Sequence, residues 1–332
     1  MAKTKKRAKK ASPRSRGSKT PFPQKDLLSL KFVRPLDVDA LFRLTSQIKK
    51  FPERFTTKLK GRSLGLVFQK PSNRTRVAFE VGMIQLGGGA VYLSDSEIQM
   101  GHREPLKDVA RTMSRYFDGI VLRTFSHRDM EEFASHSRVP VINGLSDLEH
   151  PCQVLADLFT IQSKFGKLKG TNITYIGDAN NVLNYLLYGA AYTGANLVIV
   201  TPRGYEPTEE IMKEIKLLSK DSGAKIAVSN NPFASLKNAH VIYTDVWVSM
   251  GQERQRDQRL RDFQPFQVSQ AIVSKALPDA LVMHCLPAHR GEEITDEVLE
   301  GAHSIVFEQA ENKLHAQKAL LVYLLTKKKS RK

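Results

Sequence analysis

Residues 64–80 read LGLVFQKPSNRTRVAFE, and this stretch decides the fold. Its apolar start, Leu64–Phe68, predicts a buried strand, and its mostly apolar end predicts a helix. The polar turn between them combines a helix N-terminus with hydroxyl and guanidinium groups. Free N–H groups, the positive end of the helix dipole and arginine side chains all attract anions. The turn at residues 72–76 therefore predicts either an anion-binding cradle or a capped helix with solvated arginines.

Strand-like and helix-like segments alternate along most of the chain. Short apolar runs predict strands at Leu64–Phe68, Ala90–Leu93, Gly119–Leu122, Val139–Ile142, Ile173–Ile176, Asn196–Val200, Lys225–Val228, Val241–Tyr243, Leu281–His284 and Ser304–Phe307. Apolar residues at helical spacing predict helices at 36–48, 75–87, 105–117, 128–136, 151–165, 182–192, 207–220, 232–237, 269–277 and 309–325. This alternation predicts an α/β fold with parallel sheets between layers of helices. Residues 248–267 lack clear periodicity, which predicts a lid or substrate loop.

The length of the chain sets its domain organisation. A chain of 332 residues is long for a single core, so two domains are expected. We predict two doubly wound parallel-sheet domains, over residues 25–150 and 151–326, with the active site in the cleft between them. The last helix of the second domain is able to cross back to the first. Residues 1–24 are predicted to be a disordered basic tail and residues 327–332 a second basic tail.

Charge and cysteine content narrow the class of protein. The formal net charge is +17, but nine Lys or Arg residues lie within residues 1–20 and five within 327–332, which leaves about +3 for the rest. These tails predict weak, salt-dependent binding of polyanions as a secondary property. Neither a transmembrane run nor the apolar part of a signal or transit peptide is visible. Two cysteines make no secreted disulfide scaffold, so a cytoplasmic location is expected.

In doubly wound sheets, ligands bind at the carboxyl ends of the strands, so the loops there are candidate sites. The polar segment 94–104, which contains Gln99, is interpreted as either a mobile or a solvated loop. Arg123 ends the third predicted strand and is either an anion or carbonyl ligand or a member of a surface ion pair. His150 and Gln153 lie on one face of a helix start, where they suit a planar carbamoyl group or a helix cap.

The second half of the chain offers different chemistry. No Gly-x-Gly-x-x-Gly follows the strand at 173–176, which argues against a nicotinamide or flavin site. Asn180 and Asn181 predict a polar contact or a helix cap. Asp245 suits a substrate ammonium group. Cys285 lies among histidines, which leaves open a nucleophilic Cys–His pair or a zinc site, although two distant cysteines lack metal-ligand spacing.

Four motifs together resemble those of one family. They are KPSNRTR at residues 70–76, HPCQ at 150–153, DVWVSMG at 245–251 and HCLPAHRG at 284–291. In this order and at this spacing they resemble the ornithine carbamoyltransferases, within the aspartate/ornithine carbamoyltransferase superfamily. The resemblance runs from about residue 26 to 326. The SMG and HCLP motifs favour ornithine over aspartate as the acceptor, because the related aspartate enzymes lack both.

The resemblance implies transfer of a carbamoyl group from carbamoyl phosphate to L-ornithine, which yields L-citrulline and phosphate in arginine biosynthesis. The implied carbamoyl phosphate site comprises Ser72, Asn73, Arg74, Thr75, Gln99, Arg123, His150, Gln153, Cys285, Leu286 and Lys313. The implied ornithine site comprises Asn181 (or Asn180), Asp245, Ser249 and Met250. The implied catalytic residues are Arg123, His150 and Cys285. Gln99 is implied to reach the ligand across a subunit boundary in a homotrimer, and no metal or other cofactor is implied.

The implied mechanism is direct attack of the neutral δ-amine on the carbonyl carbon, without a covalent intermediate at Cys285. Preorganised donors and the alignment of two substrates are expected to supply the rate, and activity is expected to rise with pH as the ammonium loses its proton. Two positions depart from the family: Asn73 stands where threonine is common and Lys313 where arginine is common. Because lysine lacks the guanidinium fork, we predict weaker carbamoyl phosphate binding. The alternatives are another acceptor, such as putrescine or an N-acylated ornithine, and a nucleic-acid-binding protein acting through its tails.

Overall fold

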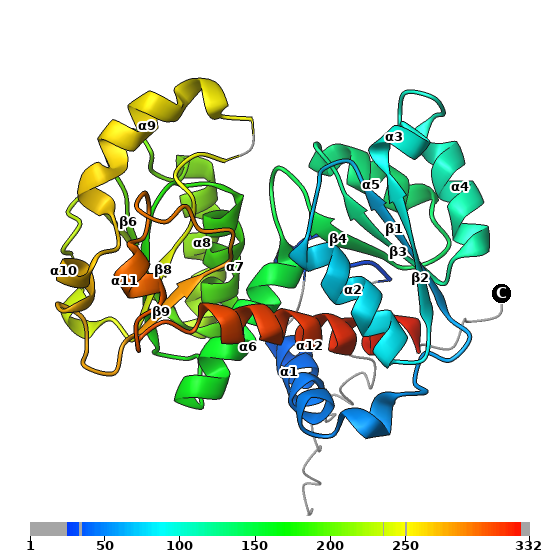
Figure 1. The fold of residues 1–332 in the computed structure, drawn as a ribbon, viewed down its shortest axis with the longest axis horizontal. Helices are drawn as coiled ribbons and strands as arrows, with labels where there is room; N and C mark the ends of the chain where they lie inside the picture. The colour runs from blue at the N-terminus through cyan, green and yellow to red at the C-terminus, as the bar shows by residue number, and fades with distance from the viewer. Residues whose placement is uncertain (1–24, 33–34, 235, 250, 327–332) are drawn as a thin grey trace, which may run out of the picture.

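The computed structural model describes residues 25–32, 35–234, 236–249 and 251–326 (Figure 1). The two predicted tails and Met250 lie outside the described residues. The chain forms two α/β units, each built on a wholly parallel sheet, which confirms the predicted fold class.

The first sheet has the order β2-β1-β3-β4. Its strands are β1 (Ser63–Phe68), β2 (Gly89–Ser94), β3 (Gly119–Arg123) and β4 (Val141–Leu145). The connecting helices are α2 (Arg74–Gln85), the short α3 (Asp95–Ile98), α4 (Leu106–Tyr116) and α5 (His127–His136). Strand β3 is fully buried, as expected for a central parallel strand with helices on both faces.

The second sheet has the order β7-β6-β5-β8-β9. Its strands are β5 (Asn172–Ile176), β6 (Asn196–Val200), β7 (Ile226–Ser229), β8 (Val241–Thr244) and β9 (Leu281–His284). Its helices are α7 (Asn181–Thr193), α8 (Glu209–Ser222), α9 (Arg256–Phe263) and two short ones, α10 (Gln270–Val273) and α11 (Asp296–Leu299). The strand order reverses between β5 and β8, and a parallel sheet binds ligands at such a point.

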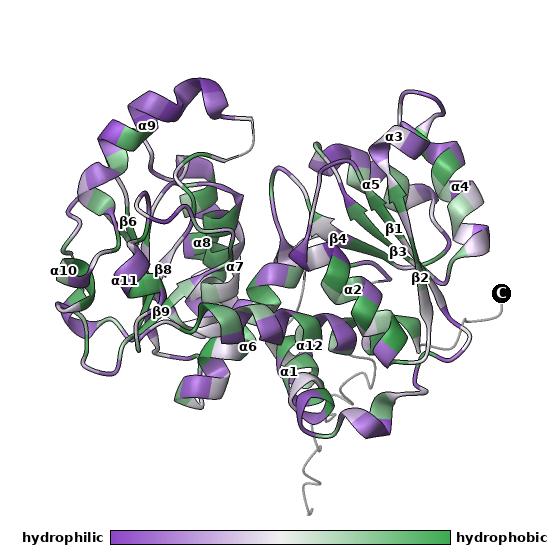
Figure 2. Cartoon of the chain, in the orientation of Figure 1, coloured by the Kyte–Doolittle hydropathy of each residue, from purple (hydrophilic) through white to green (hydrophobic). Residues whose placement is uncertain are grey.

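Helices α6 (Pro151–Phe165) and α12 (Val306–Leu325) join the two units, and α1 (Pro35–Lys50) packs against α12. Helix α12 runs beneath both sheets in Figure 1 and packs against α6, α1 and α2. Within this contact Asn312 donates to Thr160 of α6 at 2.9 Å and accepts from Lys49 of α1 at 2.8 Å. Figure 2 colours the central strands of both sheets and parts of α12 as hydrophobic. No described helix is long and apolar enough to cross a membrane.

Two predicted elements are wrong. Ser304–Phe307 is not a strand, because only Ser304 bridges to Val282 before α12 begins at Val306. The helix predicted at 232–237 is absent; the chain there turns and forms a 3₁₀ turn at Leu236–Asn238. Each segment is therefore too short to form the strand or helix that its first residues predict.

The loop predicted at 248–267 is wrong over α9, which is helical. This helix buries only Arg259 and Phe263, so its sequence shows no apolar periodicity. The guanidinium of Arg259 donates to Asp178 at 2.8 Å and to the backbone oxygen of Trp247 at 3.0 Å. A buried ion pair therefore anchors the helix where apolar contacts are few.

Candidate active site

A cavity of about 650 Å³ lies at the carboxyl ends of both sheets. Residues that directly follow β1, β3, β4, β5, β8 and β9 line it, together with side chains from α6 and α12. The predicted residues that line it are Ser72, Asn73, Arg74, Thr75, Arg123, His150, Gln153, Asn181, Asp245, Ser249, Cys285, Leu286 and Lys313. Gln99 does not line the cavity; it is exposed beyond α3 in a left-handed conformation. The cavity therefore collects residues that are up to 243 positions apart in the chain, from Lys70 to Lys313.

The turn that opens the sequence lies at the N-terminus of α2. Asn73 occupies the N-cap position, but its side chain makes no capping hydrogen bond. The first N–H groups of an α-helix have no partner within the helix, so a ligand is able to take their place. The hydroxyl of buried Thr75 lies 3.4 Å from Nε2 of His150, which starts α6. The turn at the start of α2 in the first unit therefore contacts the start of α6, the helix that leads to the second unit.

Four Lys or Arg side chains line the cavity: Lys70, which lies over Phe125, and a group of three formed by Arg74, Arg123 and Lys313. Arg123 is 7% exposed and Lys313 is 5% exposed. Within the described residues none of the three pairs with a carboxylate, and Nε of Arg123 has no hydrogen-bond partner. Burial, followed by repulsion from Arg74, lowers the pKa of Arg123 to about 10. Burial lowers the pKa of Lys313 to about 8, and the two arginines contribute to this shift.

His150 is an uncharged donor or acceptor beside these cations. Burial, then the positive charges of Lys313 and Arg123, keep the pKa of His150 well below its ordinary value. Its ring packs edge-on against Tyr185, with 6.4 Å between the ring centroids, and its Nδ1 has no partner in the part of the chain that is described. A neutral imidazole can hydrogen-bond a carbonyl group without adding another charge to the cavity.

Asp157 is a buried node beneath the cavity. Its carboxylate accepts hydrogen bonds from Gln153 Nε2 at 2.9 Å, Tyr243 OH at 2.9 Å and Gln309 Nε2 at 2.8 Å. Burial raises its pKa to about 6, against the opposing effect of these three donors. The node joins α6, β8 and α12, and it fixes the amide of Gln153 so that the carbonyl oxygen is left for a ligand.

The opposite side of the cavity centres on Asp245, which is 5% exposed. Its carboxylate accepts from Nδ2 of Asn180 at 2.8 Å and from the thiol of Cys285 at 3.1 Å. Burial raises the pKa of Asp245, and burial together with the Asp245 carboxylate holds the pKa of Cys285 well above its ordinary value. Cys285 is therefore a protonated thiol at neutral pH rather than a thiolate nucleophile.

The histidine beside Cys285 is occupied elsewhere. Nδ1 of His284 accepts from the backbone N–H of Leu286 at 2.8 Å, and its Nε2 lies 3.1 Å from Glu293 Oε1. Asp245, His284 and Cys285 are close enough to share a metal ion, but both ring nitrogens are engaged and the thiol resists deprotonation. Neither the Cys–His nucleophile nor a zinc site fits this arrangement.

Leu286 holds a strained conformation at this point. Its φ of 58° lies in the left-handed region, which costs a leucine about 1 kcal/mol or more. The hydrogen bond from its N–H to His284 holds it there. Strain of this kind collects where a backbone has to present a particular group to a ligand.

The two candidate asparagines are no longer equivalent. Asn180 caps α7 through Oδ1, which accepts from Val182 N at 2.8 Å and Leu183 N at 3.2 Å, while its Nδ2 bonds Asp245. Asn181 donates from Nδ2 to the backbone oxygen of Ser146 at 3.2 Å. Both line the cavity, but the amide oxygen and nitrogen of Asn180 are engaged within the protein, whereas Asn181 uses only its amide nitrogen.

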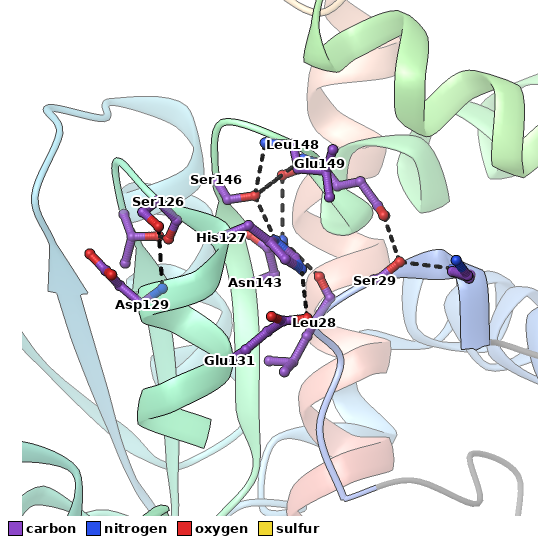
Figure 3. Close-up of polar contacts among 12 residues, drawn as sticks. Leu28, Ser29, Ser126, His127, Asp129, Glu131, Asn143, Ser146, Leu148 and Glu149 are labelled. Carbon is purple, nitrogen blue, oxygen red and sulfur yellow. Dashed lines mark hydrogen bonds and ion pairs between the residues drawn. The ribbon is translucent and has the colours of Figure 1, made fainter. Parts of the chain in front are cut away.

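Other lining residues were not predicted from the sequence. They are Lys70, Ser146, Asp147, Asn184, Tyr185, Gln252 and His289, among others. Ser146 and Asp147 directly follow β4, which ends at Leu145, three residues later than predicted. The loop that they begin is shown in Figure 3, where His127 Nδ1 lies 2.9 Å from Ser146 Oγ. The correct end of that strand would have identified both residues.

Comparison with known proteins agrees with this geometry. Residues 25–163 match the model of the aspartate/ornithine carbamoyltransferase carbamoyl-P binding domain, and residues 169–324 match that of the Asp/Orn binding domain. The chain therefore belongs to the aspartate/ornithine carbamoyltransferase family, and it is a transferase of one-carbon groups.

Relatives within this family are similar to the chain over most of its length. The chain is 51% identical over 308 residues to the ornithine carbamoyltransferase of Archaeoglobus fulgidus, covering 91% of this chain and 98% of that one. It is 49% identical over 304 residues to the ornithine carbamoyltransferase of Anoxybacillus flavithermus, covering 91% and 96%. The solved ornithine carbamoyltransferase from Pyrococcus furiosus superposes with a TM-score of 0.89 at 45% identity, covering 92% and 98%.

Proposed function

We propose that the chain is an ornithine carbamoyltransferase, which converts carbamoyl phosphate and L-ornithine into L-citrulline and phosphate. One observation carries the proposal: Arg74 and the buried Arg123 and Lys313, which pair with no carboxylate among the described residues, face the buried Asp245 carboxylate across one cavity. The cations suit an acyl phosphate dianion, and the carboxylate suits the ammonium of an amino acid. The names of the relatives at about half identity agree with this pair of ligands.

We assign the phosphate to the turn at the start of α2. Ser72, Arg74 and Thr75 with the adjacent N–H groups would bind its oxygens, and Asn73 would contribute through its backbone. The carbamoyl end would lie toward Arg123, His150 and the carbonyl oxygen of Gln153. Lys313 would balance the charge from the side of α12. These assignments follow from the shared lining of the cavity and the absence of competing partners among the described residues.

We assign ornithine to the side of Asp245. Its α-ammonium would meet the Asp245 carboxylate, and its polar groups would meet Asn181 and Ser249. Met250 stays in this proposal from the sequence motif alone. Cys285 and Leu286 lie between the two ligands, where the δ-amine has to approach the carbonyl carbon.

The proposed reaction is direct transfer. The neutral δ-amine attacks the carbonyl carbon, and negative charge develops on the carbonyl oxygen and then on the departing phosphate. Arg123 and His150 would stabilise the first charge, and the cradle with Arg74 would stabilise the second. Cys285 would remain a neutral thiol beside the amine, because its pKa is raised.

We also propose a homotrimer with a shared site, working in the cytoplasm in arginine biosynthesis. Val77 and Ile84 of α2 and Val91 of the edge strand β2 are exposed apolar residues on one unit. Gln99 lies beyond this strand, so a neighbouring subunit placed there would bring Gln99 toward another cavity. Light scattering of an Ile84→Asp variant tests this: the parent should be trimeric and the variant monomeric with impaired activity.

The proposed activity is tested with four acceptors. Carbamoyl phosphate is supplied with ornithine, putrescine, N-acetylornithine or aspartate, and the carbamoylated product is measured. Ornithine should exceed each other amine by at least about 100-fold in kcat/KM, because putrescine and N-acetylornithine offer Asp245 no α-ammonium of an amino acid and aspartate has no δ-amine. A preference for any other amine overturns the proposal.

A further inference from the structure

Residues 27–31, called the strap here, cross from one unit to the other ahead of α1. The strap starts with a single parallel bridge between Leu27 and Ile142 of β4. Leu27 donates from its N–H to Val141 O at 2.9 Å and accepts from Asn143 N at 2.8 Å. The strap is therefore fixed to the first sheet by backbone hydrogen bonds at the edge that adjoins the second unit.

The middle of the strap holds a buried carboxylate. Ser29 Oγ donates to Glu149 Oε1 at 2.6 Å (Figure 3), and the N–H of Leu30 donates to Oε2 at 3.0 Å. Glu149 is 2% exposed and does not line the cavity. Among the described residues no Lys or Arg pairs with this carboxylate, and a buried carboxylate without such a partner is costly to retain for stability alone. The position of Glu149 in the fold points to a role other than stability.

The far end of the strap is attached to the second unit. Lys31 Nζ lies 2.5 Å from Glu214 Oε1 of α8, and the hydroxyl of Tyr192 of α7 donates to the backbone oxygen of Lys31. Tyr188 of α7 donates to the other carboxylate oxygen of Glu214 at 3.0 Å. The five residues of the strap thus touch β4, the 146–150 loop, α7 and α8.

Glu149 belongs to the loop that closes the cavity between the two units. Its backbone oxygen accepts from Ser146 N at 2.9 Å and from Asn143 Nδ2 at 3.4 Å, so its main chain shapes the loop. The next residue is His150, and Ser146 receives the hydrogen bond of Asn181 from the other unit. A shift of Glu149 would therefore move a residue on each side of the cavity.

We propose that Ser29 and Glu149 are positioning residues, which set the 146–150 loop and through it the distance between the phosphate side and the acceptor side of the cavity. This inference rests on the proposed function. Ser29 and Glu149 act through His150 and through the contact between Ser146 and Asn181. Misplacement of aligned groups by a fraction of an ångström lowers the rate of a two-substrate reaction strongly while binding of one substrate persists.

The test compares Ser29→Ala and Glu149→Gln with Ser29→Thr, which keeps the hydroxyl. Glu149→Gln leaves one acceptor oxygen for two donors. Both disruptive variants should lower kcat/KM for ornithine by roughly tenfold and change the dissociation constant of carbamoyl phosphate by less than about twofold. Ser29→Thr should restore most of the activity.

A matched pair of surface variants distinguishes an effect on the position of the 146–150 loop from an effect on the stability of the fold. Lys31→Met removes the ion pair with Glu214, and Lys164→Met removes an ion pair of the same 2.5 Å length between α6 and α12. Lys31→Met should lower kcat/KM for ornithine by about threefold, and Lys164→Met should leave it unchanged at an equal shift in Tm. Equal effects of the two variants on kcat/KM would overturn the role of the strap.

Amide hydrogen exchange of residues 143–150 supplies a readout that needs no activity. Exchange there should quicken in Ser29→Ala and Glu149→Gln and stay unchanged in Lys164→Met. Unchanged exchange, or a parallel loss of carbamoyl phosphate binding and kcat/KM, contradicts the positioning role. If the parent carbamoylates none of the four amines, the proposed function fails, and the exchange comparison still decides whether the strap holds the loop.

Discussion

The charged side chains on the two sides of the cavity differ in whether they already have partners within the protein. On the phosphate side, Arg74, Arg123 and Lys313 lie together without carboxylate partners among the described residues. On the acceptor side, Asp245 already accepts hydrogen bonds from Asn180 and Cys285. The first side gains its counter-charge only from a ligand, whereas the second is ordered before any ligand arrives. Anion binding should therefore stabilise the phosphate side most.

The largest expected effect comes from removing a cation on the phosphate side. Arg123→Met should lower kcat by about 100- to 1000-fold, because one preorganised donor to the developing charge is lost. Steady-state kinetics with both substrates at saturation measures this. Arg76, which pairs with Glu80 and does not line the cavity, provides the control variant Arg76→Met. A fall of less than about tenfold would show that Arg123 is not among the groups that stabilise the transition state.

On the acceptor side, Asp245→Asn should lower kcat/KM for ornithine by about 100-fold, since the substrate ammonium loses its counter-charge. The dissociation constant of carbamoyl phosphate, measured by calorimetry, should change less than about threefold. Asp178→Asn is a poor control because Asp178 holds Arg259, whereas the exposed Asp221 of α8 provides a suitable one, Asp221→Asn. Equal losses for both substrates would mean that the two sides are not separable.

A smaller effect is expected at the boundary between the sides. Cys285→Ala should lower kcat by about tenfold or less, because a neutral thiol that donates to Asp245 orients a group and forms no bond to the substrate. Mass spectrometry of the parent during turnover should find no carbamoyl adduct on Cys285. Abolished turnover in the variant, together with a trapped thioester in the parent, would establish covalent catalysis instead.

The smallest effect is a pH dependence set by Lys313. Its pKa is lowered from 10.5 to about 8, so the free protein has a charged Lys313 below that pH and a neutral one above it. Anion binding favours the charged form, so affinity for carbamoyl phosphate should be level below pH 8 and fall several-fold as pH rises toward 10. Calorimetry over this range measures the slope.

Lys313→Arg should remove that alkaline loss and tighten carbamoyl phosphate binding about threefold, because a guanidinium stays charged and donates in pairs. A lower or unchanged affinity in the variant would show that the lysine already makes the best contact available. A slope that persists in Lys313→Arg would assign the pH dependence to another group.

The sequence predicted the loops of the site better than its individual contacts. Strand–helix alternation placed the loops after β1, β3, β5, β8 and β9, because parallel sheets bind ligands at one edge. It missed Ser146 and Asp147, since Asn143 and Gly144 are poor strand formers and the predicted strand stopped before them. Side-chain pairing also stayed hidden: nothing in the pattern shows that Asn180, and not Asn181, bonds Asp245.

Lys313 shows a second limit of the sequence. It lies on α12, which carries no loop motif, and only the resemblance to a family pointed to it. Its place in the cavity depends on the packing of α12 against α6 and α2, which is a long-range contact. Local periodicity predicts that the helix exists and leaves open which of its side chains reaches a site.

The node at Asp157 also bears on how this family can change over time. One carboxylate serves Gln153, Tyr243 and Gln309, which come from three separate elements. Exchange of Asp157 would take one acceptor from three buried donors, and exchange of a donor would remove one hydrogen bond from a buried carboxylate, so single substitutions here should cost more than a concerted set. These four positions should therefore be inherited as a unit, and lineages that alter one should alter the rest together.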